Sequence, residues 1–88
     1  MSEALTPTVE DYLGLIYLLQ RNGESTIGAR LAERLGVSRP TVTVTLQRME
    51  RAGLVVLGEH KDISLTPAGI KAAQDLLRKK GLAKMDGR

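Results

Sequence analysis

The chain contains no cysteine, no phenylalanine and no tryptophan, and its only aromatic side chains are two tyrosines. Without cysteine, disulfide bonds and thiolate metal sites are excluded. Both tyrosines, Tyr12 and Tyr17, lie in one N-terminal segment, so the chain lacks the aromatic platforms on which single-stranded nucleic acids stack. Any core must therefore be built from aliphatic side chains.

Long apolar runs are also absent. The longest, residues 15–19, is far shorter than the ~20 residues that a membrane-spanning helix needs. The N-terminal residues do not combine a basic stretch with an apolar one, so no secretory signal is predicted. A chain of 88 residues has room for one domain with one core. We expect a soluble, cytoplasmic, single-domain protein that does not contact membranes.

Charge is unevenly distributed along the chain. Residues 1–37 carry three basic and five acidic side chains, whereas residues 66–88 carry six basic and two acidic ones. The formal net charge of +3 is compatible with a polyanionic partner, but it does not by itself indicate one.

The first two helices are predicted from the spacing of apolar residues. Thr8 forms a capping-box pattern with Asp11, and helical spacing continues from there to residue 21. A shorter second helix follows Ser25 and Thr26, which can both cap its start, and Gly36 can close it in the left-handed conformation. The side chains expected to face the core are Val9, Tyr12, Leu13, Ile16, Tyr17 and Leu19 in the first helix and Ile27, Leu31, Ala32 and Leu35 in the second.

A third helix is predicted over residues 38–51. Ser38 can cap it, and Pro40 falls in its first turn, where the missing N–H does no harm. The connection to the second helix is so short that the two helices should cross steeply, as in a helix-turn-helix.

The remaining residues predict a hairpin and a fourth helix. Residues 54–57 and 63–65 are rich in β-formers and flank a polar connection of five residues. Thr66 and Pro67 begin a fourth helix that should stop near Gly81. The predicted fold is mainly α, a winged helix-turn-helix with three helices, a two-stranded wing and a fourth helix. It forms one domain over residues 1–81, and residues 82–88 form a flexible tail. The inward side chains of the fourth helix should be Ile70, Ala73, Leu76 and Leu77.

The third helix has two different faces. One face should pack on the first two helices through Val42, Thr45, Leu46 and Met49. The opposite face carries small side chains first and arginines later, which suits a helix whose first turns reach base edges in a major groove ~12 Å wide. An ordinary solvated helix face is the alternative interpretation. The predicted DNA-binding residues are Ser38, Arg39, Pro40, Thr41, Thr43, Val44, Gln47, Arg48 and Arg51, with His60 and Lys61 in the wing connection.

Four motifs occur in order: TVEDYLGLIY at 8–17, LAERLGVSRPTVT at 31–43, QRMERAGLV at 47–55 and LTPAG at 65–69. Together they resemble the N-terminal DNA-binding domain of the diphtheria-toxin-repressor family. The resemblance implies an iron- or manganese-dependent repressor that binds a palindromic operator as a dimer. Some members carry glutamine where this chain has Val44, so base readout here should rely on methyl contacts. By position, the resemblance implies that Ser38, Pro40, Thr41, Thr43 and Val44 face the groove and that Arg48 and Arg51 lie near the DNA backbone.

The chain departs from the family at the metal ligands that the resemblance implies. Asp11 matches a ligand position of the manganese-type members, but Gly14 stands where their second N-terminal carboxylate would be. Lys80 and Lys84 take the positions of a histidine and an acidic ligand, and ammonium groups have no lone pair to offer a metal. His60 is isolated. We expect no metal cofactor, with divalent iron or manganese as the alternative, and a fixed cation near Asp11 tying the fourth helix to the first.

We predict a sequence-specific regulator of transcription, a repressor by family analogy, that binds double-stranded DNA as a homodimer. The dimer surface is expected on the outer side of the first and fourth helices, at Leu15, Leu18 and Leu77. One alternative is a fragment of a metal-dependent repressor that lacks its dimerisation and metal-sensing parts. Another is a winged helix used for protein–protein contact. An enzyme is not expected, because the chain has one histidine, no cysteine, no glycine-rich phosphate loop and no carboxylate pair placed with a base on a shared face.

Overall fold

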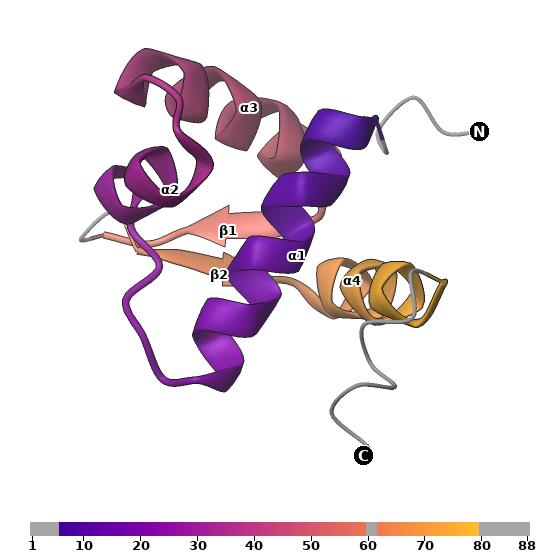
Figure 1. Cartoon of the computed structure of the whole chain (residues 1–88). Coiled ribbons are helices and arrows are strands. Elements are labelled where there is room, and N and C mark those ends of the chain that lie inside the picture. Colours follow the sequence, from indigo (N-terminus) through magenta and orange to yellow (C-terminus); the bar gives the residue numbers. More distant parts are fainter. Residues whose placement is uncertain (1–5, 60–61, 80–88) are drawn as a thin grey trace.

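The computed structural model describes residues 6–59 and 62–79, and within these ranges it forms four helices and a two-stranded sheet (Figure 1). The predicted winged helix-turn-helix is therefore confirmed. The predicted domain end at Gly81, the tail over 82–88 and the wing residues His60 and Lys61 lie outside the described residues. The elements are α1 (Pro7–Arg21), α2 (Gly28–Leu35), α3 (Arg39–Arg51), β1 (Val55–Leu57), β2 (Ile63–Leu65) and α4 (Pro67–Lys79).

The core forms around α1 and is aliphatic except for Tyr12. This helix contacts α2, β2 and α4, so its buried side chains touch most of the fold (Figure 1). Burying an aliphatic side chain of this size contributes about 1.5 to 3 kcal/mol. The buried residues of α1 are Val9, Tyr12, Leu13, Ile16 and Leu19, and the other elements add Leu31, Val42, Met49, Val55, Ile63 and Ala73.

The start of α1 differs from the prediction. Thr6, not Thr8, is the N-cap, and its Oγ1 accepts a hydrogen bond from the Val9 N–H at 3.2 Å. Pro7 occupies the first helical position, where a proline leaves no N–H unpaired and already has a helical φ. Threonines precede and follow Pro7 in the sequence. Because the proline occupies the first helical position, the threonine before it, Thr6, becomes the N-cap.

The start of α2 also differs from the prediction, because neither Ser25 nor Thr26 caps it. The N-cap residue is Ile27, which makes no side-chain cap bond. The buried Thr26 hydroxyl instead donates to the Ile63 carbonyl oxygen at 2.6 Å, and the Ile63 N–H donates to the Thr26 carbonyl oxygen at 2.8 Å. These two bonds attach the loop before α2 to one edge of β2. The helix ends as predicted, at Gly36 with φ 70°.

The wing is a short antiparallel hairpin. β1 pairs with β2 in the register Val55 opposite Leu65 and Leu57 opposite Ile63. The first strand begins one residue later than predicted. The Gln20 Oε1 atom accepts a hydrogen bond from the Leu65 N–H at 3.0 Å, so α1 holds the hairpin through a side chain. The wing is therefore fixed to the helical core at its base.

Thr66 joins the end of α3 to the start of α4. Its N–H donates to the Leu54 carbonyl oxygen at 3.0 Å, and its hydroxyl donates to the Gly53 carbonyl oxygen at 2.6 Å. The same Oγ1 accepts from the Gly69 N–H at 3.0 Å, which is the predicted cap of α4. Three hydrogen bonds thus meet at one residue, because chain segments on both sides of the wing converge there.

One inward prediction for α4 is wrong. Ile70 is 36% exposed, whereas Ala73 and Leu77 are buried as expected and Leu76 is partly buried. Gly69 takes the buried position in the first turn, since it packs against the backbone of Leu54. This close approach turns Ile70 toward solvent. Within the described ranges, no helix combines the length and hydropathy that crossing a lipid bilayer requires.

Candidate nucleic-acid interface

One half of α3 anchors the helix, as predicted. Val42 and Met49 are almost fully buried, and Thr45 and Leu46 are buried beside them. At the N-terminus, the Ser38 Oγ atom accepts a hydrogen bond from the Thr41 N–H at 3.2 Å, so the predicted cap is confirmed. The position and the first turn of α3 are therefore both fixed.

The other half of α3 faces solvent. Val44 is 55% exposed, which is a high value for a large apolar side chain, and a shallow hollow beside it extends from Pro40 to Arg48. The half of α3 that carries small and cationic side chains, as predicted from the sequence, thus does not pack against the rest of the fold. All the α3 residues predicted to bind DNA and the N-cap are exposed, namely Ser38, Arg39, Pro40, Thr41, Thr43, Val44, Gln47, Arg48 and Arg51. Glu50 of the same helix is exposed as well.

Arginines on α2 have carboxylate partners. Glu24 Oε1 lies 3.5 Å from Arg30 Nη1 and 3.2 Å from Arg34 Nη2, and both pairs are partly exposed. Such pairs contribute little to stability, but they partly neutralise the local charge. The corresponding contacts in α4 join Asp75 to Lys71 at 3.9 Å and to Arg78 at 2.9 Å.

The arginines of α3 differ from these. Arg39, Arg48 and Arg51 have no carboxylate partner among the residues that the structure describes, although Glu50 lies in the same helix. All three are exposed. A cation without an intramolecular partner loses no ion pair when it contacts a phosphate. The exposed half of α3 is therefore suited to an anionic partner.

The resemblance to metal-dependent repressors can be compared with the residues around Asp11. Asp11 is exposed, and a Cβ added at Gly14 would be in ordinary contact with Leu77 Cδ2, at 3.9 Å. Within residues 6–59 and 62–79, no group of three or more His, Cys, Asp or Glu side chains is placed to hold a metal ion. Lys80 and Lys84 lie outside the described residues. Of the ligand positions that the resemblance implies, the described residues include Asp11, which carries a carboxylate, and Gly14, which has no side-chain donor atom. The absence of a metal cofactor stays a prediction.

The apolar surface predicted for dimer contact is only partly present. Leu18 is 41% exposed and Leu15 is partly buried. Leu77, in contrast, is only 6% exposed, and its Cδ2 atom lies 3.9 Å from the position that a Cβ would take at Gly14. Leu77 belongs to the core because α4 packs directly on α1. The prediction that Leu77 belongs to the dimer surface is therefore wrong, whereas its predicted inward position is confirmed.

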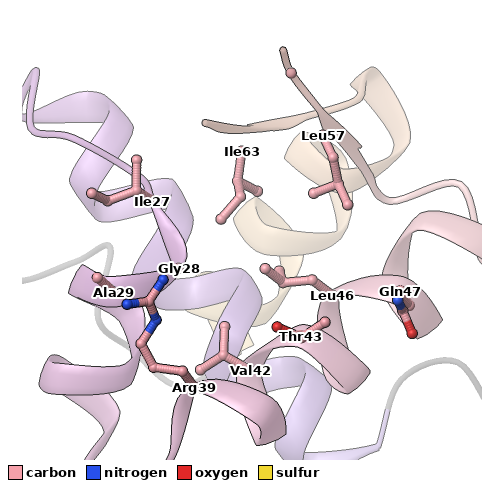
Figure 2. Close-up of a pocket in the computed structure, with 11 residues that line it drawn as sticks. Ile27, Gly28, Ala29, Arg39, Val42, Thr43, Leu46, Gln47, Leu57 and Ile63 are labelled. Atoms are coloured by element: carbon pink, nitrogen blue, oxygen red, sulfur yellow. The ribbon is translucent and has the colours of Figure 1, made fainter. Parts of the chain in front are cut away.

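One feature was not predicted from the sequence. A groove of about 440 Å³ lies between the start of α2, the exposed edge of α3 and the hairpin (Figure 2). Its walls come from three segments that are far apart in the chain. Local periodicity carries no signal for such a groove.

Comparisons with known proteins agree with this geometry. The sequence profile of the family described as "Iron dependent repressor, N-terminal DNA binding domain" matches residues 4–63. The diphtheria toxin repressor of Corynebacterium diphtheriae is 46% identical over 79 residues, which are 90% of this chain and 35% of that protein. The iron-dependent repressor IdeR of Mycobacterium leprae is 43% identical over 90% of this chain and 34% of its own length.

The fold comparison gives the same result. The structure of the manganese regulator SloR superimposes with a TM-score of 0.74 at 33% identity, covering 85% of this chain and 35% of that one. The chain spans about a third of the length of the curated relatives it matches. The profile match covers more than half of the chain, and it includes all of α1, α2 and α3. This chain belongs to the iron-dependent repressor family, in the part that forms the N-terminal DNA-binding domain.

Proposed function

We propose that this chain is the DNA-binding domain of a transcriptional repressor and that α3 enters the major groove of double-stranded DNA. The observation that carries the proposal is the division of α3 into a buried apolar half and an exposed half whose arginines have no partner among the described residues. Family membership supports the same function. An enzymatic role is not proposed, because the relatives compared are regulators.

The order of side chains along α3 matches the geometry of groove binding. Thr41 and Val44 lie near the N-terminus and are short enough for close approach to base edges, and the Val44 methyl groups suit the methyl group of thymine. Arg48 and Arg51 come about one and two turns after Val44, toward the end of the helix, and they suit phosphates. Sequence preference should therefore depend on the first two turns and general affinity on the last one.

We also propose that the functional form is a homodimer on a palindromic operator. Two copies of a helix-turn-helix bind half-sites whose centres lie about 34 Å apart, one turn of the duplex. Each copy alone makes few contacts, so joining two raises affinity through effective concentration. The partly exposed leucines of α1, Leu15 and Leu18, are available for such contact.

The first prediction is that this chain binds duplex DNA with a strong dependence on salt. Fluorescence anisotropy with a labelled duplex, chosen by selection from a random pool, should show log Kobs falling linearly with log salt concentration. A single-stranded competitor of the same sequence should compete poorly, because the chain lacks aromatic platforms for unpaired bases. Weak binding with a flat salt dependence would favour the alternative, a winged helix that contacts proteins.

The second prediction is that duplex binding does not require a metal ion. The reason is that the described residues lack a group of ligands and that Gly14 offers no side chain beside Asp11. Binding measured with and without a chelator in excess should give the same affinity. Loss of binding on chelation, with recovery on adding iron or manganese, would show that the metal dependence of the family is retained.

A further inference from the structure

The groove between α2, α3 and the hairpin has an apolar interior. Val42 and Leu46 of α3 and Ile63 of β2 form its floor (Figure 2). Ile27 and Leu57 lie on the hairpin side of it, and Ile27 is 38% exposed although it is a large aliphatic residue. The volume of about 440 Å³ lies within the range of small-molecule sites, about 300 to 1,000 Å³. The floor is therefore large enough to cover the apolar part of a small molecule.

The polar side chains of the groove all come from α3. They are Arg39, Thr43 and Gln47, and Figure 2 places Arg39 and Gln47 at opposite ends. Arg39 lines the groove together with Gly28 and Ala29, where α2 begins (Figure 2). It has no carboxylate partner among the described residues, and no described residue that lines the groove is acidic. The lining thus combines an apolar floor with one positive charge, that of Arg39, at one end. The carboxylate of Asp62, which does not line the groove, lies beside Gly58 on the hairpin side.

We propose that this groove is a binding site for a small amphipathic carboxylate. The apolar body of the ligand lies over Leu46 between Ile27 and Leu57, and its carboxylate contacts the Arg39 guanidinium. A carboxylate matches the planar guanidinium with two parallel hydrogen bonds, which gives the ligand one orientation in the groove. A neutral molecule of the same shape gains only the apolar contact.

Binding in the groove has a consequence for DNA recognition, and this part rests on the proposed function. Arg39, Thr43 and Gln47 also belong to the exposed half of α3 that is proposed to face the duplex. A ligand that occupies them competes with DNA for the same side chains and adds a negative charge beside the phosphates. The expected effect is therefore release of the duplex, and the groove is a site for an effector.

The experiment records methyl chemical shifts of the whole chain during titration with two probes, naphthalene-2-carboxylate and octanoate. Shifts should be largest at Ile27, Leu46, Leu57 and Ile63 and negligible at Leu13, which is buried in the core next to α4. Naphthalene-2-carboxamide has the same rings without the charge and should bind about tenfold more weakly.

Two pairs of variants separate the parts of the proposal. Arg39→Gln should abolish the preference for carboxylate over carboxamide, whereas Arg48→Gln, which removes an exposed arginine of the same helix outside the groove, should leave it unchanged. Leu57→Ser should weaken both probes. Val56→Ser changes the neighbouring and more exposed residue of β1, and it should leave the affinity for both probes unchanged.

The outcomes distinguish this inference from the proposed function. If the duplex binds but neither probe shifts the groove methyl groups, or if Arg39→Gln binds the carboxylate as well as the unchanged chain, the inference is overturned. If the probes bind as expected and no duplex binds, the inference about the groove as a carboxylate site holds and the proposed function fails. If both bind, adding probe should lower duplex affinity in the unchanged chain and have little effect in Arg39→Gln.

Discussion

Replacing Arg48 and Arg51 together by alanine is expected to weaken duplex binding by about 10- to 100-fold, with a similar loss for every DNA sequence. Each arginine neutralises one phosphate and releases its counterions, so the slope of log Kobs against log salt concentration should fall by about two. Anisotropy titrations at several salt concentrations, on a selected duplex and on an unrelated one, measure both quantities. An unchanged slope would contradict the contact with phosphates.

The matched control removes two positive charges from α4. Lys71 and Arg78 both contact Asp75, so their replacement by alanine changes the net charge equally but leaves α3 intact. This control should keep the salt slope close to that of the unchanged chain. A slope that falls equally in both double variants would show that net charge, and not the position of Arg48 and Arg51, governs binding. Both double variants should fold normally, because exposed substitutions usually change stability by less than about 0.5 kcal/mol.

Gly69→Ala is expected to destabilise the fold by about 3 kcal/mol or more. A Cβ at this position falls against the carbonyl oxygen of Leu54 and lies 3.2 Å from Leu65 Cδ2. The carbonyl group cannot move freely, because it accepts the hydrogen bond from the Thr66 N–H. Urea unfolding followed by circular dichroism should show a much lower midpoint, and the chain would have to separate α4 from the end of α3 to accommodate the methyl group.

Gly14→Ala provides the control for this substitution. Gly14 lies inside α1, and among the described residues a Cβ there meets only Leu77 Cδ2, at 3.9 Å. Alanine is favoured over glycine inside a helix by about 1 kcal/mol, so this variant should be as stable as the unchanged chain or more stable. Equal unfolding midpoints for Gly69→Ala and the unchanged chain would show that the close approach to Leu54 does not exist in solution.

The two faces of α3 could be predicted from the sequence because they depend on local geometry alone. A period of 100° per residue separates Val42 and Met49 from Val44 and Arg48 without any knowledge of what packs on the helix. The short connection between α2 and α3 also follows from local information, since Gly36 closes α2 and Ser38 caps α3. These features determine the candidate interface.

Other features depend on residues distant in the chain, and the sequence did not reveal them. Thr26 has the chemistry of an N-cap, but its hydroxyl is used by the Ile63 carbonyl oxygen, 37 positions away. Ile70 has an inward position by periodicity, but Gly69 approaches the backbone of Leu54 more closely than any larger residue can. The groove beside Arg39 likewise exists only after the hairpin has packed across α2 and α3.

The bonds of Thr66 have a consequence for the spacing of two bound copies. Because Thr66 bonds to Gly53 and Leu54 and also caps α4, hydrogen bonds link the end of α3 directly to the start of α4. If the proposed dimer forms through α1 and α4, a second copy would present its own α3 at a set distance and angle. Inserting one base pair at the centre of an operator rotates one half by about 35°, and a rigid pair of domains cannot follow that rotation.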